Sequence, residues 1–191
     1  MFYPLIVGRT GAFFILAAAL FLVLFVFRPH AVNRIFMLMA REEDITKGIL
    51  IGPLVYISSV VVCVALYPVF ISATSIGVMA FGDGFATLVG KRWGRHHTPL
   101  DRNKTYEGSV AFVVFAFIAT FLAMTITAPL ASYGDIALLA LAGAVSGAVV
   151  EMLPFSEHRG SNIFQRLIID DNFFVPIIAG LAIYSTYVYL I

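Results

Sequence analysis

The chain has 191 residues, of which 61% are hydrophobic and 12% are charged, whereas soluble domains are roughly half apolar and a quarter charged. The net charge of +1 provides no broad basic surface for nucleic acid, and the phenylalanines lie in apolar runs without interleaved lysine or arginine. We therefore expect an integral membrane protein and exclude nucleic acid as a partner. The single cysteine, Cys63, has no second thiol for a disulfide or a metal site.

Long uncharged stretches define the predicted membrane spans, because a helix needs about 20 residues to cross the ~30 Å hydrocarbon core of a bilayer. In chain order these stretches are residues 10–27, 48–82, 108–134, 136–150 and 172–191. The second is too long for one span, and we expect it to turn at Pro68 and continue past Asp83 to Val89 as an antiparallel helix. The sequence thus predicts an all-α, polytopic bundle of about six transmembrane helices, in one domain covering residues 1–191.

Basic residues gather in three connections of this predicted bundle. These connections are residues 28–47 with Arg28, Arg34, Arg41 and Lys47, residues 91–106 with Lys91, Arg92, Arg95, Arg102 and Lys104, and residues 154–171 with Arg159 and Arg166. Only Arg9 lies on the other side of the predicted bundle. Because basic residues are retained on the cytoplasmic side, we expect these connections to be cytoplasmic and both termini to lie on the opposite face. The membrane is then the cell membrane, or the endoplasmic reticulum in a eukaryote.

Acidic residues within or beside spans are costly and usually functional, and here they converge on the basic side. Asp83 lies about two helical turns inside the third span if that span ends near Gly90. Four more acids occupy neighbouring helix ends: Glu107 opens the fourth span, Glu151 closes the fifth, and Asp170 and Asp171 precede the sixth. For Glu107 or Asp170 alone, an ordinary charge at the water interface is the simpler interpretation. Asp83, between Gly82 and Gly84, indicates function.

Small residues recur at every fourth position from Gly82 through Ala86 and Gly90 to Gly94. Such a stripe usually permits close helix packing. Beyond Gly90, however, the segment adds Lys91, Arg92, Lys104 and Thr105 before Glu107-Gly108 opens the next helix. Glycines that let backbone N–H groups approach phosphate, lysines that neutralise it and a helix start together predict an anion site, and nearby carboxylates would suit magnesium.

Two common motifs do not describe this segment. A P-loop needs four residues between its glycines and a serine or threonine after the lysine. Here Gly84 and Gly90 enclose five residues, and Arg92 follows Lys91. His96 and His97 lack further ligands at helical spacing, so we expect a solvated pair of loop histidines rather than a zinc site.

The combined motifs resemble a known family. The spacing Asp83-x-x-Ala86-x-x-x-Gly90-x-x-x-Gly94, followed by Lys104-Thr105-x-Glu107-Gly108, resembles the CTP-binding signature of the CTP-dependent lipid kinases. That family includes dolichol kinases, phytol kinases and fungal-type diacylglycerol kinases. Further similar pieces are Arg41-Glu42-Glu43, Glu151-x-x-Pro154 and Asp171-Asn172-x-x-x-Pro176, so the resemblance extends over roughly residues 40–180.

The resemblance implies transfer of the γ-phosphate of CTP to the hydroxyl of a membrane lipid alcohol, with Mg²⁺ as cofactor. The acceptor would be a polyprenol such as dolichol, phytol or geranylgeraniol, or diacylglycerol. The implied roles are magnesium binding for Asp83 and Asp171, triphosphate contact for Lys104 and Lys91, and orientation or deprotonation of the hydroxyl for Glu107 or Glu151. Ala86, Gly90, Gly94, Thr105 and Gly108 would line the nucleotide site. The active face would be the cytoplasmic one.

Two alternatives stay open from the sequence. A membrane cytidylyltransferase would use the same CTP and magnesium but would release pyrophosphate and form a CDP-lipid. A small ion- or proton-coupled transporter would use Asp83 and Glu151 to line a path across the membrane. The grouping of the acids at one predicted interface favours an enzyme over a transporter.

Overall fold

A computed structural model describes residues 3–26, 50–127, 132–155 and 170–190, together with the isolated positions 36, 37, 45 and 48. Its elements, in chain order, are α1 (Tyr3–Phe21), the π-helical turn η1 (Leu22–Val26), α4 (Ile51–Leu66), α5 (Val69–Trp93), α6 (Tyr106–Thr127), α7 (Tyr133–Glu151) and α9 (Asp171–Leu190). Within these ranges the regular elements are all helical, and the pairing of His97 with Thr105 is an isolated bridge. The prediction of an all-α fold is confirmed.

Four helices are long and apolar enough to cross a membrane, namely α5, α6, α7 and α9. The first two predicted spans contain shorter apolar helices, Thr10–Leu24 and Ile51–Leu66. A helix of 16 residues such as α4 is about 24 Å long, which is less than the ~30 Å of a typical hydrocarbon core. The polytopic membrane architecture is confirmed, with four of the six predicted spans reaching full length.

The predicted turn at Pro68 is present between α4 and α5. Tyr67 has extended backbone angles (φ −107°, ψ 156°), as expected for a residue that precedes proline. Pro68 then occupies the N-cap of α5, where its carbonyl accepts a 2.9 Å hydrogen bond from the Ser72 amide. The Ser72 hydroxyl also donates to the Cys63 carbonyl at 2.8 Å. These bonds join the end of α4 to the start of α5.

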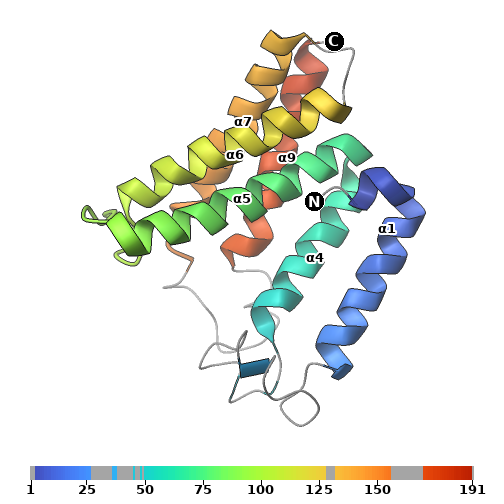
Figure 1. The fold of residues 1–191 in the computed structure, drawn as a ribbon, viewed down its shortest axis with the longest axis horizontal. Helices are drawn as coiled ribbons and strands as arrows, with labels where there is room; N and C mark the ends of the chain where they lie inside the picture. Colours follow the sequence, from blue (N-terminus) through green and yellow to red (C-terminus); the bar gives the residue numbers. More distant parts are fainter. Residues whose placement is uncertain are drawn as a thin grey trace.

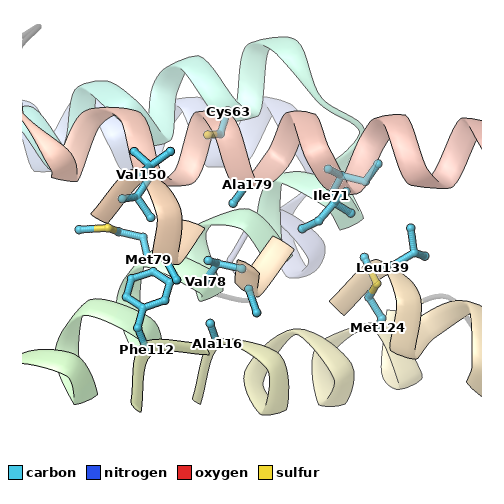
Figure 2. Packing of buried hydrophobic residues seen from close by; sticks show 14 of the residues in the cluster. Cys63, Ile71, Val78, Met79, Phe112, Ala116, Met124, Leu139, Val150 and Ala179 are labelled. Atoms are coloured by element: carbon cyan, nitrogen blue, oxygen red, sulfur yellow. The ribbon is translucent and has the colours of Figure 1, made fainter. Parts of the chain in front are cut away.

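Helix α5 is central, because it contacts α6, α7 and α9, and it runs beside α6, against which it packs most extensively (Figure 1). Figure 2 shows the resulting core, in which Val78 and Met79 of α5 face Phe112 and Ala116 of α6. The small residues predicted to permit close packing lie at these contacts. A β-carbon added to Gly82 would stand 2.6 Å from the Phe112 ring. The helix contact therefore depends on the missing side chain.

One helix boundary differs from the prediction, and another extends an uncharged run. Helix α5 does not end near Gly90 but continues to Trp93, with Gly94 as its C-cap. Asp83 therefore lies ten residues from the helix end, or about 15 Å, which is deeper than predicted. Helix α7 spans Tyr133–Glu151 and so includes Asp135 and Glu151 at the ends of the short uncharged run 136–150. The Ser132 hydroxyl caps the helix by accepting a hydrogen bond from the Asp135 amide.

Several sequence predictions lie outside the described residues. They concern the Arg41-Glu42-Glu43 segment and the basic residues of two connections, Arg28, Arg34, Arg41, Lys47, Arg159 and Arg166. The basic residues of the third connection are described, and they lie at the end where α5 joins α6 (Figure 1). Which side of the membrane this end faces stays a prediction.

Candidate active site

A cavity of about 680 Å³ lies where four helix ends meet. Its walls come from the last turns of α5, the connection from α5 to α6, the start of α6, the end of α7 and the start of α9. All but one of the predicted site residues line it: Asp83, Ala86, Gly90, Lys91, Gly94, Lys104, Thr105, Gly108, Glu151 and Asp171. Glu107 is the exception. The structure thus brings together residues that are up to 88 positions apart in the sequence.

Lys104 is the centre of the charged groups in this cavity. Its Nζ lies 3.0 Å from Glu151 Oε1 and 3.0 Å from Asp171 Oδ2, and it also donates to the backbone carbonyl of Glu151. The side chains are 14%, 11% and 21% exposed for Lys104, Glu151 and Asp171. Burial lowers the pKa of Lys104, but the two facing carboxylates outweigh that effect, so the pKa is raised above its ordinary value. Lys104 is therefore a cation at neutral pH.

A tight hydrogen-bonded hairpin positions Lys104. The Thr98 amide donates to the Lys104 carbonyl at 2.9 Å, and the Lys104 amide donates to the Asp101 carbonyl at 3.0 Å. Asp101 is 2% exposed, and its Oδ1 accepts a 2.9 Å bond from the Asn103 amide. The Thr98 hydroxyl closes the turn by donating to the Asp101 carbonyl at 2.8 Å. The backbone that carries Lys104 is thus held by local bonds on both sides.

Thr105 and the neighbouring glycines join this hairpin to the helices. The Thr105 hydroxyl caps α6 by accepting a 3.2 Å hydrogen bond from the Gly108 amide. A β-carbon on Gly108 would lie 3.0 Å from the Ala86 carbonyl oxygen, and one on Gly90 would lie 3.1 Å from Thr105 Oγ1. The glycines therefore let α5 and α6 approach closely beside the cavity.

Two backbone N–H groups beside the cavity are engaged within the protein. The Gly94 amide donates to the Gly90 carbonyl at 3.0 Å, and the Tyr106 amide donates to the His96 carbonyl at 2.9 Å. The reason is that α5 continues through Gly90, so its carbonyl caps the helix end at Gly94. In this conformation those two amides are not open to an anion, whereas the side chains of Lys91 and Lys104 line the cavity.

Glu107 lies outside the cavity and holds the hairpin from its other side. Its Oε1 lies 2.7 Å from His96 Nδ1, and its Oε2 accepts a 3.3 Å bond from the His96 amide. The His96 side chain is 77% exposed, in keeping with a solvated loop histidine, while His97 lines the cavity. Glu107 is thus placed to position the segment that carries Lys104.

The cavity also contains residues that the sequence reasoning did not select. They are Thr87, His97, Asp101, Asn103, Ser109 and Asn172. Thr87 could have been found, because it lies four residues from both Asp83 and Lys91 and therefore on the same helical face. Asn172 is oriented by Asp170, whose Oδ1 accepts bonds from its amide and from its Nδ2 at 3.0 and 2.8 Å. No sequence pattern indicated Asp101 as a cavity residue, because its burial depends on the hairpin.

The cavity suits a divalent cation that arrives with phosphate. Among the described residues, no group of three or more His, Cys, Asp or Glu side chains forms a ready metal cage. Magnesium, however, is usually bound by one or two carboxylates together with substrate phosphates. Glu151 and Asp171 already share one cation, the Lys104 ammonium, and Asp83 lines the same cavity. The donor set therefore fits Mg²⁺ held partly by a bound nucleotide.

Sequence comparisons identify relatives over most of the chain. Probable phytol kinase 1, chloroplastic, of Oryza sativa subsp. japonica is 31% identical over 160 residues, which are 78% of this chain and 46% of that protein. Farnesol kinase, chloroplastic, of Arabidopsis thaliana is 30% identical over 151 residues, 75% of this chain and 45% of that protein. The phytol kinase of Synechocystis sp. is 36% identical over 98 residues, 50% and 40% of the two chains.

No protein-family model matches the chain, and no solved structure matches it. The chain spans about half the length of the curated relatives that it matches. The resemblance seen in the motifs is nevertheless confirmed by relatives of two names, phytol kinase and farnesol kinase. Over 75–78% of its length the chain is thus a homologue of phytol and farnesol kinases, consistent with the lipid kinase family that its motifs resemble.

Proposed function

We propose that this protein transfers the γ-phosphate of a nucleoside triphosphate to the primary hydroxyl of an isoprenoid lipid alcohol. The observation that carries the proposal is the Lys104–Glu151–Asp171 cluster, which lies in a cavity at the ends of membrane-length helices. The relatives are named for phytol and farnesol, both isoprenoid alcohols. The motif from Asp83 to Gly108 favours CTP as the donor, and the carboxylates favour magnesium as its companion.

The transfer needs few groups, because phosphoryl transfer depends mostly on positioning and charge stabilisation. The hydroxyl oxygen of the alcohol attacks the γ-phosphorus and forms a new P–O bond. The bond from the γ-phosphorus to its bridging oxygen breaks, and its electron pair leaves with the nucleoside diphosphate. The hydroxyl proton passes to Glu151, the carboxylate that we propose as base. Bound magnesium supplies positive charge to the phosphate oxygens and would be held by Asp171 and Asp83.

Lys104 has two tasks in this proposal. Without nucleotide, its ammonium neutralises Glu151 and Asp171, which would repel each other if both were ionised and unpaired. Asp171 would hold the magnesium of a bound nucleotide, and the charge of that ion would then neutralise the carboxylate in place of the Lys104 ammonium. The flexible lysine stem then lets Nζ move to the transferred phosphoryl group. Lys104 would thus keep the carboxylates ready and afterwards stabilise the transition-state charge.

Two alternatives make different products. A cytidylyltransferase would release pyrophosphate and leave a CDP-lipid, whereas a kinase leaves a lipid monophosphate and a nucleoside diphosphate. A transporter would need polar groups along the membrane path. Here Asp83, Glu151 and Asp171 share one cavity at one end of the helices, which supports an enzyme.

The proposal is tested with the full chain purified in detergent. It is incubated with magnesium and γ-labelled CTP or ATP, and separately with farnesol, phytol, geranylgeraniol, dolichol or diacylglycerol. We expect label in the phosphate of an isoprenoid alcohol, with CTP preferred. Absence of labelled lipid, together with pyrophosphate release, would establish the cytidylyltransferase instead. Absence of both products with every acceptor would overturn the proposed activity.

A further inference from the structure

A second hollow of about 610 Å³ lies on the outer face of α5, lined by Gly84, Thr87, Leu88, Lys91 and Arg92. These positions follow the spacing of three and four residues that places side chains on one face of a helix. The groove is therefore one helix face wide, apolar at Gly84 and Leu88 and cationic at Lys91 and Arg92.

The groove is continuous with the active cavity. Thr87 and Lys91 line both spaces and thus form the boundary between them. Asp83 lies one helical turn from Thr87, about 6 Å along the axis, and faces the active cavity. A polar group that rests at Thr87 would consequently be within reach of the active-site residues, while the molecule it belongs to stays in the groove.

Gly84 borders the groove at a position where helix packing does not require a glycine. A β-carbon on Gly84 would meet no atom within 4 Å, whereas the same addition at Gly82 would meet the Phe112 ring at 2.6 Å. Gly82 is thus needed for contact with α6, and Gly84 is not. Next to this open floor, Leu88 is 56% exposed and forms an apolar wall. The absent side chain at position 84 leaves room for a ligand.

We infer that this groove binds the lipid alcohol acceptor, with its hydroxyl at Thr87 and its first isoprenoid units along Leu88 and Gly84. The inference rests on the proposed function and adds the place of the acceptor. The order of groups in the groove matches such a molecule, because the cations lie toward the helix end and the apolar residues lie deeper in the span. Lys91 and Arg92 would hold the phosphate of the product. A groove formed by a single helix face suits one chain rather than the paired chains of diacylglycerol.

Substitution of Gly84 tests the groove, since the added side chain has room to enter it without disturbing α6. In Gly84→Phe we expect the KM for farnesol to rise about tenfold or more, as for blocked apolar sites, with the KM for the nucleotide unchanged. Leu88→Ala, which removes the wall instead, should raise the same KM. The matched control is Val110→Phe, which adds the same ring at a position of α6 that is 64% exposed and outside both spaces. An unchanged farnesol KM in both groove variants, or an equal rise in the control, would overturn the groove.

Photolabelling separates this inference from the proposed activity. A farnesol analogue with a diazirine in its second isoprenoid unit is bound to the wild-type chain, irradiated and mapped by mass spectrometry. We expect saturable label on the peptide containing Gly84 to Leu88 and loss of that label in Gly84→Phe. Phosphate transfer with label confined to other helices would overturn the groove but leave the kinase. Saturable groove label without phosphate transfer would support the groove and overturn the kinase.

Discussion

Each end of helix α7 carries an acidic residue, and these two residues have very different surroundings. Asp135, in the first turn, is partly exposed and accepts a 2.8 Å hydrogen bond from the Ser132 hydroxyl, so it completes a helix cap. Glu151, in the last turn, is 8% exposed and paired with a lysine from another helix connection. In sequence, both are carboxylates at the edge of an apolar run. Burial and a partner distant in sequence distinguish them.

The same contrast holds for the two ends of the bundle. The end that contains Glu151 also contains Asp83, Lys104 and Asp171, and it encloses a cavity. The end that contains Asp135 provides local caps and turns, as at Ser132 and Pro68. We call these the cavity end and the capped end. If the cavity end is the active site, equivalent substitutions at the two ends must differ in their effect on catalysis.

The largest expected difference follows from removing one carboxylate charge at each end. Asp171→Asn should lower kcat by about 10²–10³-fold, because it deletes a proposed magnesium ligand and its charge in the transition state. The loss should shrink at high magnesium concentration. Asp135→Asn, the control at the capped end, should leave kcat unchanged. Equal activity of the two variants would remove Asp171 from the catalytic site.

Removal of the Lys104 charge should affect both activity and stability. Lys104→Met leaves Glu151 and Asp171 facing each other without a cation, and we expect a loss of about 2–3 kcal/mol in unfolding free energy. This is less than the ~3–5 kcal/mol of a fully buried pair, because the three side chains retain some exposure. Thermal unfolding in detergent measures the change.

Magnesium provides the readout specific to Lys104. If the ammonium occupies the cation position, added Mg²⁺ alone should raise the melting temperature of Lys104→Met more than that of the wild type. Lys91→Met, at an exposed residue of the same cavity, should melt like the wild type. No magnesium effect in Lys104→Met would contradict the exchange of cations.

Sequence reasoning predicted most of the residues at the cavity end, because the residues of a spaced motif stay near one another in the folded chain. Periodicity placed Gly82, Ala86 and Gly90 on one helical face, and the turn at Pro68 followed from its chemistry. Two features depended on tertiary contacts and were missed. Helix α5 continues past Gly90 to Trp93, and its C-cap Gly94 packs closely against Thr105 of the hairpin. The buried Asp101 is held by bonds to Thr98 and Asn103. Short polar segments carry no periodic pattern, so such contacts cannot be read in advance.

Glycine substitutions at the two ends should differ by a smaller amount. Gly108→Ala would place a β-carbon 3.0 Å from the Ala86 carbonyl and 3.1 Å from Thr105 Oγ1, so α5 and α6 must separate slightly. We expect a loss of about 1–3 kcal/mol in stability and a severalfold lower kcat, since Thr105 adjoins Lys104. At the capped end, Gly134→Ala meets Ser132 Oγ at an ordinary 3.6 Å. It should be neutral or slightly stabilising through helix propensity. Melting temperatures of the two variants provide the comparison.

The smallest effect is expected at Glu107, and it decides which glutamate accepts the proton. Glu107 bonds to His96 outside the cavity, so Glu107→Gln should loosen the hairpin and raise the nucleotide KM a few fold with kcat nearly unchanged. Glu151→Gln removes the proposed base and should lower kcat by about 10²-fold or more. His96→Ala should reproduce the Glu107→Gln change, because both break the same contact. A large fall of kcat in Glu107→Gln, without the same fall in His96→Ala, would instead make Glu107 the base and leave Glu151 as the partner that holds Lys104.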